Sequence, residues 1–389
     1  MKKTLLASTA LVGAALMAAP ASAGTVGSKD ALNVSLGGTL WFAVVMKDED
    51  VSAGQGRGYR FTVNESEVHV KASNTADNGI KYGVAIELNG GGNDGTAADE
   101  AHAFISSKSW GRIELGDNDD VTNRMQLGAW NAHKGLGGPF GGLGMLVTGW
   151  GGVGSDTLQA RADWQVLTTS DTTKVSYFSP RFSGFQVGAS LTPDTGVNSA
   201  SLGDTDNDGD EENVIGLAAN YVGKFDDVSI GLSAQMENGT GESASGSAAV
   251  QEDLSVWGVG GNIGFGGFKI GAHYRDLGDT FLTTALTAAG ADSGSLWAVA
   301  VGYQAGPWGV SAWYHEGTKD NSTTASAAGA LETTVERLGF GAGYTVAPGW
   351  LLRADLEFLN HENATTAAGT GATTDNDGTA FLLTNMFFF

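Results

Sequence analysis

The residues with the most suggestive spacing for chemistry are the acids between positions 204 and 212. Acids occupy positions one, three and five of a calcium-loop pattern, and Gly209 occupies position six. Position twelve is Ile215, where that pattern needs a bidentate Glu, and a predicted strand follows instead of a helix. Calcium is therefore a hypothesis, and an ordinary acidic surface loop is the alternative. The candidate ligands are Asp204, Asp206, Asp208 and Asp210.

No arrangement typical of an enzyme stands out in the rest of the chain. The histidines are scattered without a paired metal spacing, and no Gly-rich phosphate loop or nucleophile elbow is found. We therefore expect no catalytic residue and no required cofactor. The histidines are His69, His102, His133, His273, His315 and His361.

The elements that must position these residues are strands. A short aromatic-flanked turn recurs about every 40 residues, as at 221–225 and 265–268. Apolar residues alternate with small or polar ones between the turns, for example over 297–304. Loops rich in Asp, Gly, Thr and Ala follow at the other end of each strand pair. This polarity is what a barrel embedded in an outer membrane needs.

The predicted strands number sixteen, joined by long loops at one end and short turns at the other. One interval breaks the rhythm, because an extra loop lies between Asp117 and Asp171. We expect this loop, about 117–171, to fold into the lumen and narrow it. The predicted strands are 31–46, 60–73, 80–89, 100–106, 110–117, 172–180, 185–192, 213–222, 226–236, 252–263, 268–276, 294–304, 308–316, 333–345, 350–360 and 379–389.

The ends and the composition agree with export. Residues 1–23 have the pattern of a secretory signal peptide, with cleavage predicted between Ala23 and Gly24. Residues 24–389 then form one barrel domain. The chain has no cysteine, so it closes by hydrogen bonds and packing. Its formal net charge of −22 argues against nucleic acid as a partner.

With these strands in place, the chain resembles the Gram-negative general porins of the trimeric sixteen-stranded type. The stretches 175–190 and 110–117 carry the strongest local likeness. The resemblance implies a loop with acids opposite bases on the barrel wall, and it maps the loop acids to Asp117, Asp119 and Asp120. It also implies an eyelet Arg near the end of the loop, for which the candidate is Arg161.

Strand parity supplies the other candidates for the lumen. His69, Lys71 and Glu67 should point opposite to Val68, and Lys81 and Glu87 should face the lumen from the next strand. Parity around Arg60 allows either face. The remaining candidates are Arg112, Glu114 and Arg124.

The C-terminus fits the assembly signal of the family. Members end on an aromatic residue, with alternating apolar residues before it, which the barrel-assembly machinery recognises. Asn385 departs from this pattern. The matching residues are Phe381, Leu383, Phe387 and Phe389. The resemblance further implies a homotrimer in the outer membrane of a Gram-negative bacterium, in contact with lipid and lipopolysaccharide.

The expected function is passive diffusion of small hydrophilic solutes, with a weak cation preference from the acidic balance. One alternative is a substrate-specific channel for sugar or phosphate, in which tryptophans form a stacking track. The candidate tryptophans are Trp41, Trp130, Trp150 and Trp164. The other alternative is a soluble secreted β-propeller, whose blades also repeat at about 40–45 residues.

Overall fold

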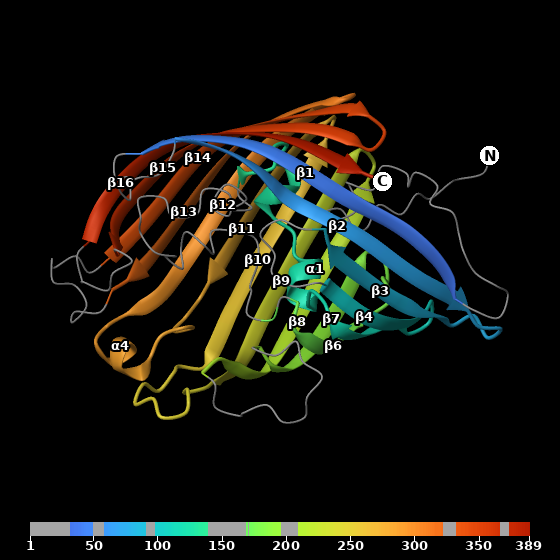
Figure 1. Ribbon diagram of the computed structural model, residues 1–389, viewed down its shortest axis with the longest axis horizontal. Coiled ribbons are helices and arrows are strands. Elements are labelled where there is room, and N and C mark those ends of the chain that lie inside the picture. Colours follow the sequence, from blue (N-terminus) through green and yellow to red (C-terminus); the bar gives the residue numbers. More distant parts are fainter. Residues whose placement is uncertain are drawn as a thin grey trace.

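The computed structural model shows a closed antiparallel barrel in which each strand pairs with its neighbours in sequence, and β1 pairs with β16 (Figure 1). It describes residues 32–49, 58–90, 98–138, 169, 171–195, 209–321, 332–365 and 373–389. The predicted architecture is confirmed, and the β-propeller alternative is wrong. The signal peptide and its cleavage site at Ala23 and Gly24 lie outside the described residues.

The strands agree closely with those expected from the alternation, although many are longer at the end away from the short turns. The strands are β1 (Asn33–Glu49), β2 (Tyr59–Thr75), β3 (Lys81–Asn89), β4 (Ala98–Ser107), β5 (Gly111–Asp117), β6 (Thr173–Phe178), β7 (Phe185–Asp194), β8 (Glu211–Phe225), β9 (Val228–Gly241), β10 (Leu254–Phe265), β11 (Phe268–Asp276), β12 (Asp292–Ala305), β13 (Trp308–Asp320), β14 (Glu332–Ala347), β15 (Trp350–Thr365) and β16 (Thr373–Phe388).

The two faces of each strand have different chemistry. On β12, Trp297 and Val301 are 39% and 43% exposed. Leu296 and Ala298, the two neighbours of Trp297 along the strand, are fully buried. The exposed row is the outer face of the barrel, where lipid replaces water around apolar side chains. The buried rows of the wall are rich in small and polar residues and face the interior.

The barrel closes at the chain terminus. The backbone N–H of Gly38 in β1 donates to the carbonyl oxygen of Phe389 at 2.9 Å, and the N–H of Phe389 donates back at 3.1 Å. A side chain at position 38 would collide with the Phe389 ring. Closure satisfies the backbone of both terminal strands, which lipid could not do.

Aromatic side chains form two belts on the outer face. The predicted belt beside the short turns contains stacked or tilted pairs such as Trp308–Tyr344, with ring centroids 4.2 Å apart. A second belt, which the sequence analysis missed, lies nearer the long loops and includes Trp257–Tyr274 and Trp297–Tyr314. Two belts are the expected anchors at the two membrane interfaces.

The structure corrects one expectation about the strands and decides one question that the sequence left open. The last strand begins at Thr373, earlier than predicted, because the turn-like residues Asn376 to Gly378 pair with β15 as part of the ladder. In β2, the register shifts between Trp41 and Phe42 of its partner β1. This bulge reverses the inward and outward alternation in the part of β2 between Tyr59 and the bulge. Arg60 therefore pairs with the buried Val45 and lies on the inner face.

The helical elements are short. The chain after β5 forms helix α1 (Val121–Met125) and the 3₁₀ turn η1 (Ala129–Asn131), and helix α4 (Thr284–Ala288) lies in the loop before β12. Helix α1 packs against β6 to β9 and η1 against β10 to β12 (Figure 1). Among the described residues, no helix has the length and apolar character needed to cross a membrane.

Candidate pore-lining site

Basic side chains gather on the inner wall of β2, β3 and β5, and Arg124 of helix α1 joins them through Glu114 of β5. Lys71 lies over the ring of buried Phe104, with its ammonium 5.6 Å from the ring centroid, and the Arg112 guanidinium lies 4.0 Å from the same centroid. Arg124 of helix α1 lies over the ring of Phe178 at 4.6 Å. Each contact holds a cation against an aromatic face. The charges of Lys81, Arg112 and Arg124 act on Lys71. We call these four side chains, Lys71, Lys81, Arg112 and Arg124, the basic group.

Glu114 holds this basic group together. Its carboxylate is fully buried and forms ion pairs with both Arg112 and Arg124. Asn118 donates to the same carboxylate at 2.6 Å. A buried carboxylate needs such partners to compensate for lost hydration. Glu114 therefore joins the wall to the first turn of the long loop.

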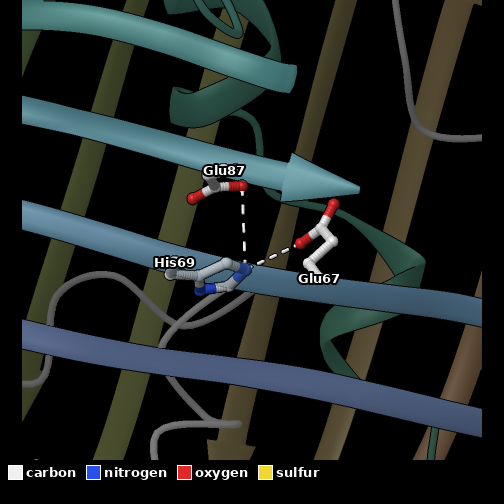
Figure 2. A group of neighbouring side chains, drawn as sticks. All are labelled: Glu67, His69 and Glu87. Atoms are coloured by element: carbon white, nitrogen blue, oxygen red, sulfur yellow. Dashed lines mark hydrogen bonds and ion pairs between the residues drawn. The ribbon is translucent and has the colours of Figure 1, made fainter. Parts of the chain in front are cut away.

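An acidic group lies beside the basic group, on the side of the long loops. His69 separates two of its members, with Nε2 2.7 Å from an oxygen of Glu67 and 3.9 Å from an oxygen of Glu87 (Figure 2). Oxygens of Glu100, Asp119 and Asp171 lie within 4.8 Å of one another. Burial raises the pKa of Asp119 to about 7, and the neighbouring Asp171 carboxylate adds to the effect. The acidic group is Glu67, Glu87, Glu100, Asp119 and Asp171.

The three predicted loop acids occupy different environments. Asp119 alone joins the acidic group. Asp120 is buried and caps helix α1, because its Oδ1 accepts from the backbone N–H of Asn123 at 2.9 Å. Asp117 lies on the strand face opposite to Glu114 and accepts from the Thr173 hydroxyl at 2.5 Å. Their predicted roles in permeation stay predictions, and Asp119 is the best placed of the three.

The chain after helix α1 follows the inner wall from one side of the barrel to the other. Asn220 of β8 donates to the carbonyl oxygen of Met125 at 2.8 Å, and Ser233 of β9 accepts from the N–H of Leu127 at 2.8 Å. Farther on, Nε2 of His133 contacts Asp355 of β15 at 2.8 Å. The segment therefore binds inward-facing polar groups on strands that are far apart in the sequence.

Glycines on the wall make room for this segment. A Cβ at Gly260 would come within 3.0 Å of the carbonyl oxygen of Leu127, and one at Gly302 would do so at Ala132. We call the wall glycines that a Cβ would press against this segment the glycine track. Its members are Gly188, Gly216, Gly260, Gly271, Gly302, Gly341 and Gly343.

A second set of bases lies on the other side of the barrel. Lys134, which follows η1, interacts with Lys269 of β11 and Arg353 of β15. Burial first, and then these two charges, lower the pKa of Lys134 to about 8. Arg353 also donates to the carbonyl oxygen of Lys134 at 2.5 Å. Lys134, Lys269 and Arg353 were not among the candidates. Strand parity could have placed Lys269 and Arg353 on the inner face, whereas it gives no information on Lys134, which lies in the loop.

Several predicted residues stand apart from the site or outside the described residues. Arg60 is exposed on the inner face, near the long-loop end of β2. Trp130 is 3% exposed and packs on His273, with ring centroids 4.8 Å apart. The residues that the structure does not describe are Arg161, Trp150, Trp164, Asp204, Asp206 and Asp208.

The predicted C-terminal residues lie as the alternation requires. Phe381 and Phe387 are 37% and 40% exposed on the outer face. Asn385, which departs from the expected pattern, accepts from the Trp350 indole N–H at 3.4 Å. An amide on the lipid face is therefore paired with an interfacial tryptophan. Recognition of these residues by the assembly machinery stays a prediction.

Comparison with known families decides the identity of the barrel. Residues 7–378 match the sequence model of the family described as Gram-negative porin. The chain belongs to this family. It is therefore a channel of the bacterial outer membrane. Comparison with curated protein sequences gave no match.

Solved structures agree with the fold of this porin. In-vitro folded OmpT of Vibrio cholerae has a TM-score of 0.59 at 15% identity, covering 94% of this chain and 100% of that chain. The anion-selective porin from Comamonas acidovorans has a TM-score of 0.58 at 16% identity, covering 92% and 100%. A trimer form of Vibrio cholerae OmpT has a TM-score of 0.58 at 16% identity, covering 92% of this chain and 100% of that chain. At these identities the likeness is one of fold.

Proposed function

We propose that this porin passes small hydrophilic solutes by passive diffusion, with a weak preference for cations. The acidic group on the inner wall of β2 to β4 is the observation that carries the proposal. Carboxylates lining a pore attract cations and repel anions. The formal net charge of −22 adds a negative potential at the pore entrances.

The preference is weak because bases oppose the acids. Lys71, Arg112 and Arg124 lie beside the acidic group, and Lys134 with Lys269 lies across the barrel. Charges of opposite sign on facing walls create a transverse field in the lumen and partly cancel along the pore axis. The anion-selective Comamonas porin shows that one barrel fold supports the opposite preference, so side chains must decide it.

The loop after β5 supports a narrowed lumen. Residues 118–138 follow the inner wall through the contacts of Met125, Leu127 and His133. Backbone and side chains in that position take space that water would otherwise occupy. We therefore assign the constriction to this segment together with the acidic and basic groups.

The reversal potential in a KCl gradient across a planar bilayer tests the selectivity. We expect a modest cation preference for the native chain, reduced in the double variant Glu67→Gln and Glu87→Gln. Glu362→Gln is the matched control, because Glu362 is exposed at the long-loop end of β15. A clear anion preference of the native chain would contradict the proposal.

Among the described tryptophans, Trp130 does not support the substrate-specific alternative. Trp130 is packed against His273 and offers no exposed face for a sugar ring. We therefore favour diffusion over specific binding. Single-channel current in the presence of maltose, glucose and phosphate checks this choice, because saturable block by one of them would indicate a selective pore.

We further propose a homotrimer in contact with lipid and lipopolysaccharide, delivered by the barrel-assembly machinery through the C-terminal residues. A trimer form exists for a protein of the same fold. Gel migration before and after boiling tests the oligomer, because a trimer band should be lost on boiling. Calorimetric titration with calcium tests the acidic loop that ends at Asp210, and saturable binding is the result that supports a specific site there.

A further inference from the structure

On the inner wall of β2 and β3, one group of described residues combines an imidazole with two carboxylates at the spacing of metal ligands. One oxygen each of Glu67 and Glu87 and a ring nitrogen of His69 lie within 4.8 Å of one another. Nε2 of His69 is 2.7 Å from Oε2 of Glu67 and 3.9 Å from Oε2 of Glu87 (Figure 2). Ligands of a tetrahedral zinc ion, each about 2.0–2.2 Å from the metal, are roughly 3.3–3.6 Å apart. The two measured separations lie on either side of that value, so small side-chain movements would admit the ion.

The strand geometry brings these three side chains together. Glu67 and His69 are two positions apart on β2, so they share the inner face. Glu87 of β3 lies directly opposite His69 in the register of the two strands. Directly opposite side chains of antiparallel strands are neighbours on one face of a sheet. All three ligands therefore come from the paired wall and none comes from a loop, which favours a fixed ligand geometry.

The group is open to the lumen on one side. The side chains of His69 and Glu87 are 39% and 32% exposed, whereas that of Glu67 is 11% exposed. On β1, the residue opposite His69 is Gly37, which has no side chain to cover the ring. Three protein ligands and one open position form a coordination that water completes. An ion in the channel can therefore reach the group without any movement of the wall.

The neighbouring charges favour a cation at this position. Asp99 and Glu100 of β4 lie next to the group, and their charges act on Glu67 and on Glu87 respectively. Among the bases, Arg124 of helix α1 acts on Glu87. The acids outnumber this base, so the surroundings attract a dication. A bound dication would also relieve the repulsion between the carboxylates.

We propose that Glu67, Glu87 and Nε2 of His69 bind a divalent transition-metal ion such as zinc. The nitrogen ligand favours a transition metal over calcium or magnesium, which prefer oxygen ligands. Nε2 coordinates only without its proton, so binding exchanges the hydrogen bond to Glu67 for two bonds to one ion. The site shares no residue with the acidic loop near Asp210, where calcium is the hypothesis.

An ion at this site would alter the charge of the pore. Glu67 and Glu87 belong to the acidic group, and a dication offsets the two negative charges that they carry. The bound ion should therefore reduce the cation preference, a consequence that rests on the proposed selectivity. Binding itself does not rest on it. Zinc that binds and leaves the reversal potential unchanged would contradict the proposed selectivity and support the site.

Calorimetric titration of the chelator-treated, refolded full chain with zinc chloride at pH 7.5 tests the binding. We expect a saturable zinc site that depends on the imidazole. His69→Gln and Glu87→Gln should each weaken zinc binding by at least about tenfold. Each variant must first show the heat-modifiable gel migration of a folded barrel, and Glu67→Gln replaces either one that fails to fold.

His102→Gln is the matched control, because it removes an imidazole from the neighbouring strand β4 and should leave zinc affinity unchanged. Glu362→Gln replaces this control if it does not fold. Zinc binding that His69→Gln leaves unchanged would overturn the assignment, as would an equal loss in His69→Gln and in the control. Absence of saturable zinc binding would overturn it outright. Calcium bound as tightly as zinc, with the same dependence on His69, would overturn the preference for a transition metal.

Discussion

At the scale of single residues, pairing and burial decide what each charge in this porin can do. Glu114, Asp119 and Asp120 lie within a few positions of one another, yet one is an ion-pair centre, one joins an acidic group and one caps a helix. All three side chains are carboxylic acids, and it is their surroundings that set their roles apart. A residue's role in the pore thus follows from its partners more than from its charge.

Replacing Glu114 tests the ion-pair centre. Glu114→Gln leaves Arg112 and Arg124 without their shared counter-charge, and breaking a buried pair in this way costs about 3–5 kcal/mol. Because both arginines are partly exposed, solvent screening should reduce the loss in unfolding free energy to about 1–3 kcal/mol. Denaturant unfolding in detergent measures it. Glu362→Gln is the control, and an equal effect in both variants would contradict the role of Glu114.

Raising the pH should strengthen the cation preference. The pKa of Lys134 is lowered to about 8, so this side chain is charged well below pH 8 and neutral well above it. Loss of its positive charge removes repulsion of cations near Lys269 and Arg353. We expect the reversal potential to shift toward cation selectivity between pH 7 and pH 9. The shift should be smaller in Lys134→Met, and an identical shift in that variant would rule out Lys134 as its source.

At the scale of elements, small residues on the wall decide where the loop can lie. The glycine track crosses β7 to β14 and matches the path of residues 120–135. Side chains from the loop also provide hydrogen-bond partners to buried wall groups, as Gln126 does for Arg275 at 3.0 Å. The wall and the loop are therefore complementary in shape and in polarity, which fixes one position for the loop.

Filling the track should displace the loop. Gly302→Leu places a side chain where the Ala132 carbonyl now lies. We expect the segment near η1 to move off the wall and the single-channel conductance to change from the native value. Val301→Leu, on the lipid face of the same strand, is the control and should conduct normally. Native conductance in Gly302→Leu would show that the segment does not shape the pore.

At the scale of the whole molecule, closure of the barrel depends on one seam. β1 and β16 come from opposite ends of the chain and pair over the length from Thr39–Phe388 to Glu49–Gly378. The last hydrogen bonds, between Gly38 and Phe389, complete the ladder. An open seam would leave backbone groups unpaired in lipid, so closure and membrane insertion depend on each other.

A side chain at Gly38 should weaken the seam. Gly38→Leu would collide with the Phe389 ring and with the backbone of Glu67. We expect a lower yield of the heat-modifiable folded form after refolding into detergent. Leu36→Val, on the exposed face of the same strand, should refold normally. Equal yields from the two variants would show that the seam tolerates the added volume.

The sequence by itself determined the architecture of this porin. Alternation on strands such as β12 sets the two faces, and the turn rhythm sets the number of strands. These signals are local, so each strand could be placed without knowledge of its neighbours. The inward positions of His69, Lys71 and Arg112 followed from the same parity.

Only the tertiary structure decided which residues meet. The bulge in β2 decided the face of Arg60, and the path of the loop brought Lys134 to Lys269 and His133 to Asp355. The approach of Asp119 and Asp171 to Glu100 brings the two ends of the long loop together at a wall strand. Such contacts join residues far apart in the chain, where periodicity carries no information. For that reason the barrel could be derived from its sequence, whereas the chemistry of its lumen could not.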